Sequence, residues 1–176
     1  MRADGFTLVE LLVALAVVGL VMVATLTVLE RGQQGYLLAV ARLDAQQRTR
    51  VALERVAREI RTAGFDPTGA GFAAVVDPTP TSLTIRKDLN GNGVIDAAGE
   101  AVTYLLRGTT LRRNAGGGAQ PVIEGVEGLV FSYLDAEGAA TTLPEAIRTV
   151  VIALTVHVGP SPGVATMGTQ VRLRNR

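Results

Sequence analysis

Residues 5–15 decide the fold and read Gly5-Phe6-Thr7-Leu8-Val9-Glu10-Leu11-Leu12-Val13-Ala14-Leu15. The chain then stays apolar as far as Leu29, and no charged residue lies between Glu10 and Glu30. At 1.5 Å per residue, residues 11–29 would form a helix of about 28 Å, close to the hydrocarbon thickness of a bilayer. The stretch therefore predicts a membrane-spanning helix.

The composition of the 176 residues shows how uneven the chain is. Apolar residues make up 48% but aromatic residues only 4%, so the excess hydrophobicity is aliphatic. Most of it lies in residues 6–29, which excludes a polytopic membrane protein, an intrinsically disordered chain and a simple soluble globule. The net charge of +1 gives no long-range field, and the lack of Cys excludes disulfides and thiolate catalysis.

Glu10 needs an explanation, because a carboxylate near the end of a span costs a few kcal/mol unless it finds a partner or reaches the interface. One interpretation places it in the interface without a role. In the other, cleavage after Gly5 creates an ammonium on Phe6, and Glu10 of a neighbouring subunit pairs with that amine.

The same stretch resembles the prepilin cleavage and methylation motif of type IV pilins and of the pseudopilins of type II secretion systems. The resemblance implies that a prepilin peptidase cuts between Gly5 and Phe6 and methylates the Phe6 amine. Glu10 is then the fifth residue of the mature chain and guides assembly. Major pilins carry a kinking proline where this chain has Thr25 and Thr27, a departure that favours a minor pilin or a pseudopilin.

The flank of the span predicts where the protein lies. Arg2 precedes the apolar run and favours a cytoplasmic N-terminus, so residues from about 30 onward are expected to be exported. The expected location is the inner membrane, crossed once, and then a pilus or pseudopilus. The implied partners are other pilin or pseudopilin subunits, the prepilin peptidase, the inner-membrane assembly platform and, before assembly, membrane lipid.

Residues 30–64 read as an amphipathic helix that ends near Gly64, because Gly is a favoured C-terminal cap and Pro67 follows. Glu54 with Arg58, and Arg55 with Glu59, have the spacing of i,i+4 ion pairs. The helix's apolar stripe is Leu53, Val56, Ala57, Ile60, Ala63 and Gly64.

Six arginines crowd residues 42–61 of this helix, but acids are interleaved with them and no aromatic residue alternates with them for base stacking. A solvated face or salt bridges between subunits is the preferred interpretation. DNA is a further partner that the sequence does not support.

Beyond residue 70 the pattern alternates with the period of a strand. Strands are expected at 72–76, 82–86, 101–107, 110–113, 126–134 and 147–158, with an edge strand in the tail at 169–174.

One long helix whose second half packs on an antiparallel sheet is an α+β, pilin-like plan. The expected parts are a leader at 1–5, a membrane and filament-core helix at 6–29, a helix at 30–64 that continues into the head, and a β-rich head at 65–176. Residues 53–65, 130–133, 147–152 and 171–175 also resemble minor pilins of the PilW type and J-type pseudopilins.

Residues 88–100 resemble the front half of an EF-hand calcium loop, with oxygen side chains at alternate positions and a glycine at the turn. Position 12 of an EF-hand loop is usually a Glu that binds Ca²⁺ through both carboxylate oxygens. Here that position is Gly99, and the acid, Glu100, follows one place later. The other interpretation is an Asn/Gly-rich turn capped by its own side chains. The expected ligands of a weak, structural Ca²⁺ site are Asp88, Asn90, Asn92, Asp96, the carbonyl of Val94, and Glu100.

No enzyme is predicted, because Cys is absent and no Ser lies in a Gly-x-Ser-x-Gly setting. The sequence predicts a minor pilin-like subunit that serves pilus biogenesis, motility, adhesion or DNA uptake. A type II secretion pseudopilin is the alternative, and a membrane-tethered periplasmic enzyme or receptor is the third interpretation.

Overall fold

The computed structural model describes residues 5, 7–96, 98–159 and 163–175. The chain divides into two compact units, Met1–Ala41 and Arg42–Arg176. A single helix, α1 (Leu8–Thr62), contributes to both of them. The boundaries expected from sequence at residues 5, 29 and 64 remain predictions.

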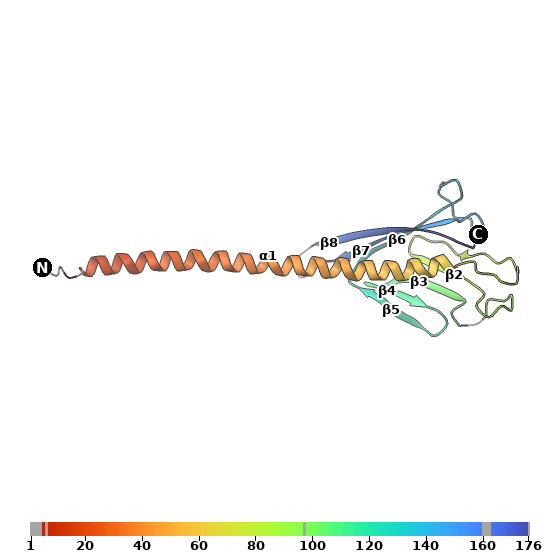
Figure 1. The fold of residues 1–176 in the computed structure, drawn as a ribbon, viewed down its shortest axis with the longest axis horizontal. Coiled ribbons are helices and arrows are strands. Elements are labelled where there is room, and N and C mark those ends of the chain that lie inside the picture. The colour runs from red at the N-terminus through yellow and green to blue at the C-terminus, as the bar shows by residue number, and fades with distance from the viewer. Residues whose placement is uncertain (1–4, 6, 97, 160–162, 176) are drawn as a thin grey trace. The chain divides into compact units, whose positions relative to one another are not determined.

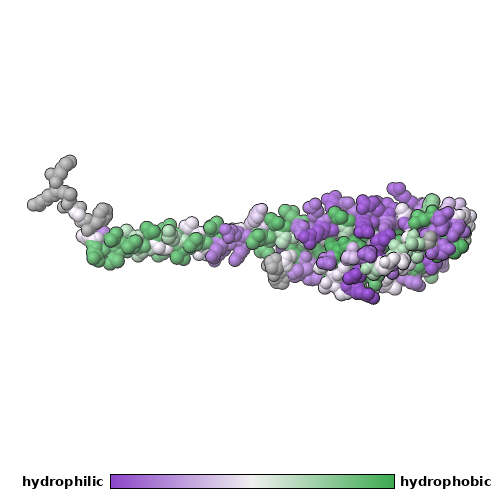
Figure 2. Space-filling model, turned by 90° about the horizontal axis from the view of Figure 1, so that it is seen from below, coloured by the Kyte–Doolittle hydropathy of each residue, from purple (hydrophilic) through white to green (hydrophobic). Residues whose placement is uncertain are grey.

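In the first unit, α1 has no covering. Every residue from 8 to 40 is exposed in the single chain, and Figure 2 shows the beginning of this segment as nearly continuous apolar surface. This is the one helix among the described residues that is long and apolar enough to cross a membrane. Length and composition alone support that statement.

In the second unit, α1 buries the predicted stripe. Leu53, Val56, Ala57 and Ile60 are buried on the helix, and Ala63 is buried just beyond it. The helix ends at Thr62, two residues before the expected cap. Gly64 has a φ of 75° and donates its N–H to the carbonyl of Arg86 at 2.8 Å, so it turns the chain toward the sheet as a C-terminal glycine does.

The head contains two antiparallel sheets where one was expected (Figure 1). The first has the order β1-β2-β3-β4-β5 and the second β6-β7-β8. The strands are β1 (Val75–Val76), β2 (Ser82–Arg86), β3 (Ala101–Arg107), β4 (Thr110–Asn114), β5 (Ala119–Glu124), β6 (Val126–Leu134), β7 (Thr149–His157) and β8 (Val164–Arg172).

Most of the expected strands are confirmed, and the differences have physical causes. The run at 72–76 shrinks to β1, and the tail strand β8 begins earlier than expected and ends at Arg172. No strand was predicted at β5, which contains Pro121. A proline cannot donate to a ladder, and β5 tolerates it because it is the edge of its sheet.

One hydrophobic cluster joins the helix to both sheets. It contains Val56 and Ile60 from α1, Tyr104 from β3 and Ile152 from β7. Because buried residues of both sheets share this cluster with the helix, the head has a single core.

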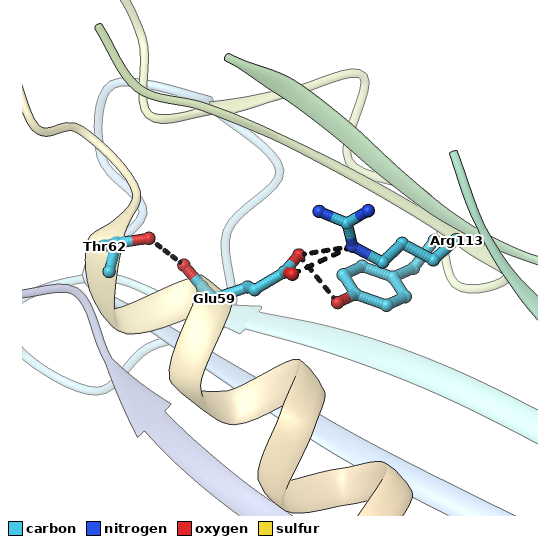
Figure 3. Close-up of polar contacts among 4 residues, drawn as sticks. Glu59, Thr62 and Arg113 are labelled. Carbon is cyan, nitrogen blue, oxygen red and sulfur yellow. Dashed lines mark hydrogen bonds and ion pairs between the residues drawn. The ribbon is translucent and has the colours of Figure 1, made fainter. Parts of the chain in front are cut away.

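A polar contact also ties the end of α1 to the first sheet (Figure 3). Arg113 Nε donates to both carboxylate oxygens of Glu59, at 2.8 and 3.0 Å, and the Tyr104 hydroxyl donates to Glu59 Oε2 at 2.8 Å. Burial, together with this hydrogen bond, raises the pKa of Tyr104, and the bond to Glu59 raises the pKa of Arg113.

The i,i+4 pairs expected from sequence are therefore wrong. Glu59 reaches across to β4, and Glu54 pairs with Arg50 at 3.3 Å instead of with Arg58. The partly buried Glu59 carboxylate pairs with residues of the first sheet that also satisfy its hydrogen bonds, whereas Arg50–Glu54 is an exposed i,i+4 pair within the helix.

The buried Tyr133 hydroxyl should make the stability of the head depend on pH. Its hydroxyl donates to the carbonyls of Thr79 and Ser82 at 2.8 and 3.1 Å, and burial raises its pKa to about 12. In the unfolded chain a tyrosine ionises near pH 10. The phenol therefore contributes stability that is complete below about pH 10 and is lost as the pH rises toward 12.

We predict that the Tm of a fragment of residues 30–176 falls between about pH 9 and pH 11.5, and falls less in Tyr133→Phe. Thermal unfolding followed by circular dichroism measures both. Tyr36→Phe is the matched control, since Tyr36 is 69% exposed. An equal fall of Tm in Tyr133→Phe and in the wild type would contradict the assignment of this pH dependence to the Tyr133 hydroxyl.

Candidate assembly segment and head loop

The helix of the assembly segment, residues 5–29, begins with a capping box. Thr7 Oγ1 accepts the N–H of Glu10 at 3.3 Å, and Glu10 Oε2 accepts both the N–H and the hydroxyl of Thr7 at 2.9 Å. This reciprocal pattern satisfies backbone N–H groups that the first helical turn leaves without partners. The Glu10 carboxylate also lies at the positive end of the helix dipole.

This role was not predicted from the sequence, although Thr7-x-x-Glu10 before an apolar run is a recognised signal for it. The structure thus gives Glu10 a function inside its own chain. Pairing with a neighbouring subunit is not tested by a single chain and remains a prediction. Glu10 Oε1 accepts no hydrogen bond from the part of the chain that the structure describes.

Gly5 lies outside the helix and is exposed. A Cβ placed on it would meet nothing within 4 Å, so the single chain itself does not demand a glycine here. Phe6, the expected methylation site, lies outside the described residues. The cleavage and methylation at Gly5 and Phe6 therefore remain predictions.

The hydroxyl groups of Thr25 and Thr27 are satisfied within the helix itself. Each hydroxyl donates to the carbonyl four residues earlier, on Val21 and Val23, at 2.8 Å. Polar groups in a lipid-facing helix need such internal partners, because lipid offers none. Two threonines thus occupy the neighbourhood of the proline of major pilins without leaving an unpaired donor.

The head loop, residues 88–100, connects β2 to β3 and is organised by its own side chains. Asp88 is fully buried, and its two oxygens accept the N–H groups of Gly91 and Gly93 at 2.7 and 2.9 Å. Asn90 and Asn92 each accept the N–H two residues ahead, at 2.9 and 2.8 Å. These are the turns that Asn and Asp side chains form readily.

Glu100 closes the head loop from its other end. It is fully buried, and its Oε1 accepts the N–H groups of Leu89 and Asn90 at 3.0 and 3.2 Å. Its Oε2 accepts the N–H of Asp96 at 3.1 Å. The structure thus places Glu100 beside the beginning of the loop, although the EF-hand numbering puts it one position too late.

The fit of this loop to a cation is incomplete. Five of the six expected ligands keep their side chains within the loop's own network, where Asn92 Nδ2 also donates to Asp96 Oδ1 at 3.4 Å. Within the described ranges, no group of three or more His, Cys, Asp or Glu residues could hold a metal ion. Val94, the expected carbonyl ligand, is 55% exposed.

Comparison with known proteins supports the prepilin-type motif expected at the N-terminus. Residues 1–26 match the family model described as the prokaryotic N-terminal methylation motif. No curated protein matches the chain. The chain therefore carries a prepilin-type methylation motif, which supports the type IV pilin and pseudopilin family, a structural rather than an enzymatic one.

Together the motif and the helix support membrane anchoring, assembly with other pilin subunits and processing by a prepilin peptidase.

Proposed function

We propose that this chain is a minor type IV pilin-like subunit that assembles through α1 into a pilus or pseudopilus, in the complex that initiates it or forms its tip. The observation that carries the proposal is the uncovered surface of residues 8–29, most of which lies within the methylation motif matched at residues 1–26. Fourteen Leu and Val side chains there, together with Met22, are more than half exposed. Each is stabilised by about 1.5–3 kcal/mol when it leaves water, so lipid or other subunits must cover them.

In this proposal the subunit lies first in the inner membrane and then in the filament. The span is inserted once in the inner membrane with its N-terminus in the cytoplasm, and the leader is removed at Gly5. The same surface then moves from lipid to neighbouring helices, which are as apolar as the lipid. The subunit needs no chemistry of its own for this step, because the resemblance implies a separate assembly platform.

The alternative is a pseudopilin of a type II secretion system, which would use the same segment. The lack of a proline near Thr25 suits both. A membrane-tethered periplasmic enzyme or receptor is the third candidate, and the peptidase site at Gly5 argues against it, since an anchor needs no processing. The neighbouring genes, or the abundance of this subunit in sheared filaments, would separate the first two.

The head loop could hold Ca²⁺ in addition, and we keep this as a second, smaller proposal. Asp88, Asn90, Asn92, Asp96 and Glu100 supply oxygen atoms. Each Asp88 carboxylate oxygen accepts one hydrogen bond from the described residues, which leaves it a second lone pair for a cation. With so few carboxylates the affinity would fall in the weak range of extracellular modules.

Processing gives the first test of the main proposal. We expect Gly5→Phe to retain the leader of residues 1–5, because the peptidase must place the residue before the cut in its site. Mass spectrometry of the membrane fraction measures this. Gly19→Ala is the control, since a Cβ on Gly19 meets nothing within 4 Å. Normal processing of Gly5→Phe would contradict the motif assignment.

Three variants separate the two roles of Glu10. Glu10→Gln keeps a capping box but removes the charge, and Thr7→Ala removes the cap but keeps the charge. If Glu10 pairs with a neighbour's amine, Glu10→Ala and Glu10→Gln should both lower incorporation into filaments by about tenfold or more. Thr7→Ala should then incorporate nearly normally.

Incorporation is measured by quantitative immunoblotting of sheared filaments against the membrane pool. Normal incorporation of Glu10→Gln, with a loss in Thr7→Ala, would show that only the cap matters. Leader removal should be unchanged in all three variants, and this confirms that the assay reports assembly.

Calorimetry tests the calcium proposal. We expect about 1 mM Ca²⁺ to raise the Tm of residues 30–176 by about 3–6 °C over the chelated state. Asp96→Asn should reduce that rise with little change in the chelated Tm, because Asp96 is exposed. Glu137→Gln, on a different loop, is the control. An unchanged Tm in the wild type would contradict the proposal.

A further inference from the structure

Five cations at one end of the head make no ion pair with any residue that the structure describes. They are Arg58 and Arg61 from α1, Lys87 just after β2, Arg172 at the end of β8, and Arg174 just beyond β8. The ion pairs within the described ranges are Arg48–Asp44, Arg50–Glu54, Arg113–Glu59 and His157–Glu127. None of them uses any of the five.

The five cations line three adjoining grooves, which we call together the basic groove. The central one has a volume of about 640 Å³ and is lined by Arg58, Arg61, Lys87 and Arg174. A second groove of about 460 Å³ shares Arg58 and Arg61 with it, and a third of about 470 Å³ shares Arg61 and Arg174. Because the linings overlap, the cations form one continuous surface.

Little negative charge opposes these cations. Glu54 is the one acidic residue that lines any of the three grooves, and Arg50 already binds it. Arg61 lies in the last turn of α1, where the helix dipole favours a cation. That effect falls off within a turn, so it does not account for Arg172, and the five like charges repel one another.

An exposed aromatic ring completes the surface. Phe65 is 45% exposed and lines the central part of the basic groove. It lies three residues beyond the end of α1 and does not alternate with the arginines along the helix. The fold brings it to them, and so supplies the stacking surface whose absence from the helix argued against nucleic acid.

We propose that the basic groove binds single-stranded nucleic acid, with phosphates on the five cations and an unpaired base stacked on Phe65. A charged groove with an aromatic platform is the arrangement that binds single strands without sequence preference. An acidic protein would use the cations but has no need of the ring. This inference concerns the head and does not depend on filament assembly.

The test measures fluorescence anisotropy of a labelled oligothymidylate of about 20 nucleotides with the full chain in a non-ionic detergent. The double variant Arg61→Gln/Arg174→Gln should bind at least about tenfold more weakly at about 50 mM salt. Its salt slope should be smaller by about 1.4, since each phosphate contact on a single strand contributes about 0.7. Arg42→Gln/Arg107→Gln has the same charge, lies outside the three grooves, and should bind as the wild type does.

Phe65→Leu separates stacking from charge. It should weaken oligothymidylate binding about fivefold or more, while inorganic polyphosphate, which has no bases, should compete equally well in Phe65→Leu and in the wild type. Circular dichroism confirms that each variant is folded.

The proposal is overturned by an oligothymidylate Kd weaker than about 100 μM at low salt, or by equal losses in the two double variants. An unchanged affinity in Phe65→Leu would also overturn it, because the groove would then bind polyanions in general. Binding is measured without assembly, so these outcomes stay distinct from any failure of the pilin-like function.

Discussion

The surface of α1 at residues 8–40 is the constraint on which the rest of the molecule depends. One continuous helix carries two apolar segments, and the chain covers only one of them: the stripe from Leu53 to Ile60 is buried in the head, whereas residues 8–40 are exposed throughout. Helix propensity alone does not hold such a surface in water, because helical stability in proteins comes mainly from packing of an apolar face. The folded head therefore leaves the covering of its own N-terminal segment to other molecules.

Glu10 shows how a charge can be retained in such a segment. Within the chain, its carboxylate caps the first turn of α1 through Thr7, with Oε2 accepting both bonds. An anion at a helix N-terminus is stabilised by the dipole as well as by the cap. Cap and intersubunit pairing are compatible, because the other oxygen is left for a second partner. A role in the free chain thus does not exclude one in the filament.

The sequence predicted what depends on local pattern. The helix to within two residues of its end, the buried stripe and the strands β2, β3 and β6 followed from periods of 3.6 and 2. The edge strand β5 was missed because Pro121 reads as a strand breaker, and its position at an edge is a property of the whole sheet.

The features that could not be predicted from the sequence depend on contacts between residues far apart in the chain. The division into two sheets, the Glu59–Arg113 contact between residues 54 positions apart and the meeting of Phe65 with Arg174 all require the folded chain. For the candidate site, the motif at Gly5 to Leu15 was readable because it is continuous in sequence. The capping box was equally readable and was overlooked.

The head loop illustrates the limit of inferring a ligand from residue types. Asp88 and Glu100 are fully buried, and a buried carboxylate must find donors or a cation. Here backbone N–H groups of the described residues meet that need, since Asp88 accepts two of them and Glu100 accepts at least three. The loop's conformation is therefore already determined by its own side chains. A cation would add its free energy to an ordered loop, and it is not required to fold one.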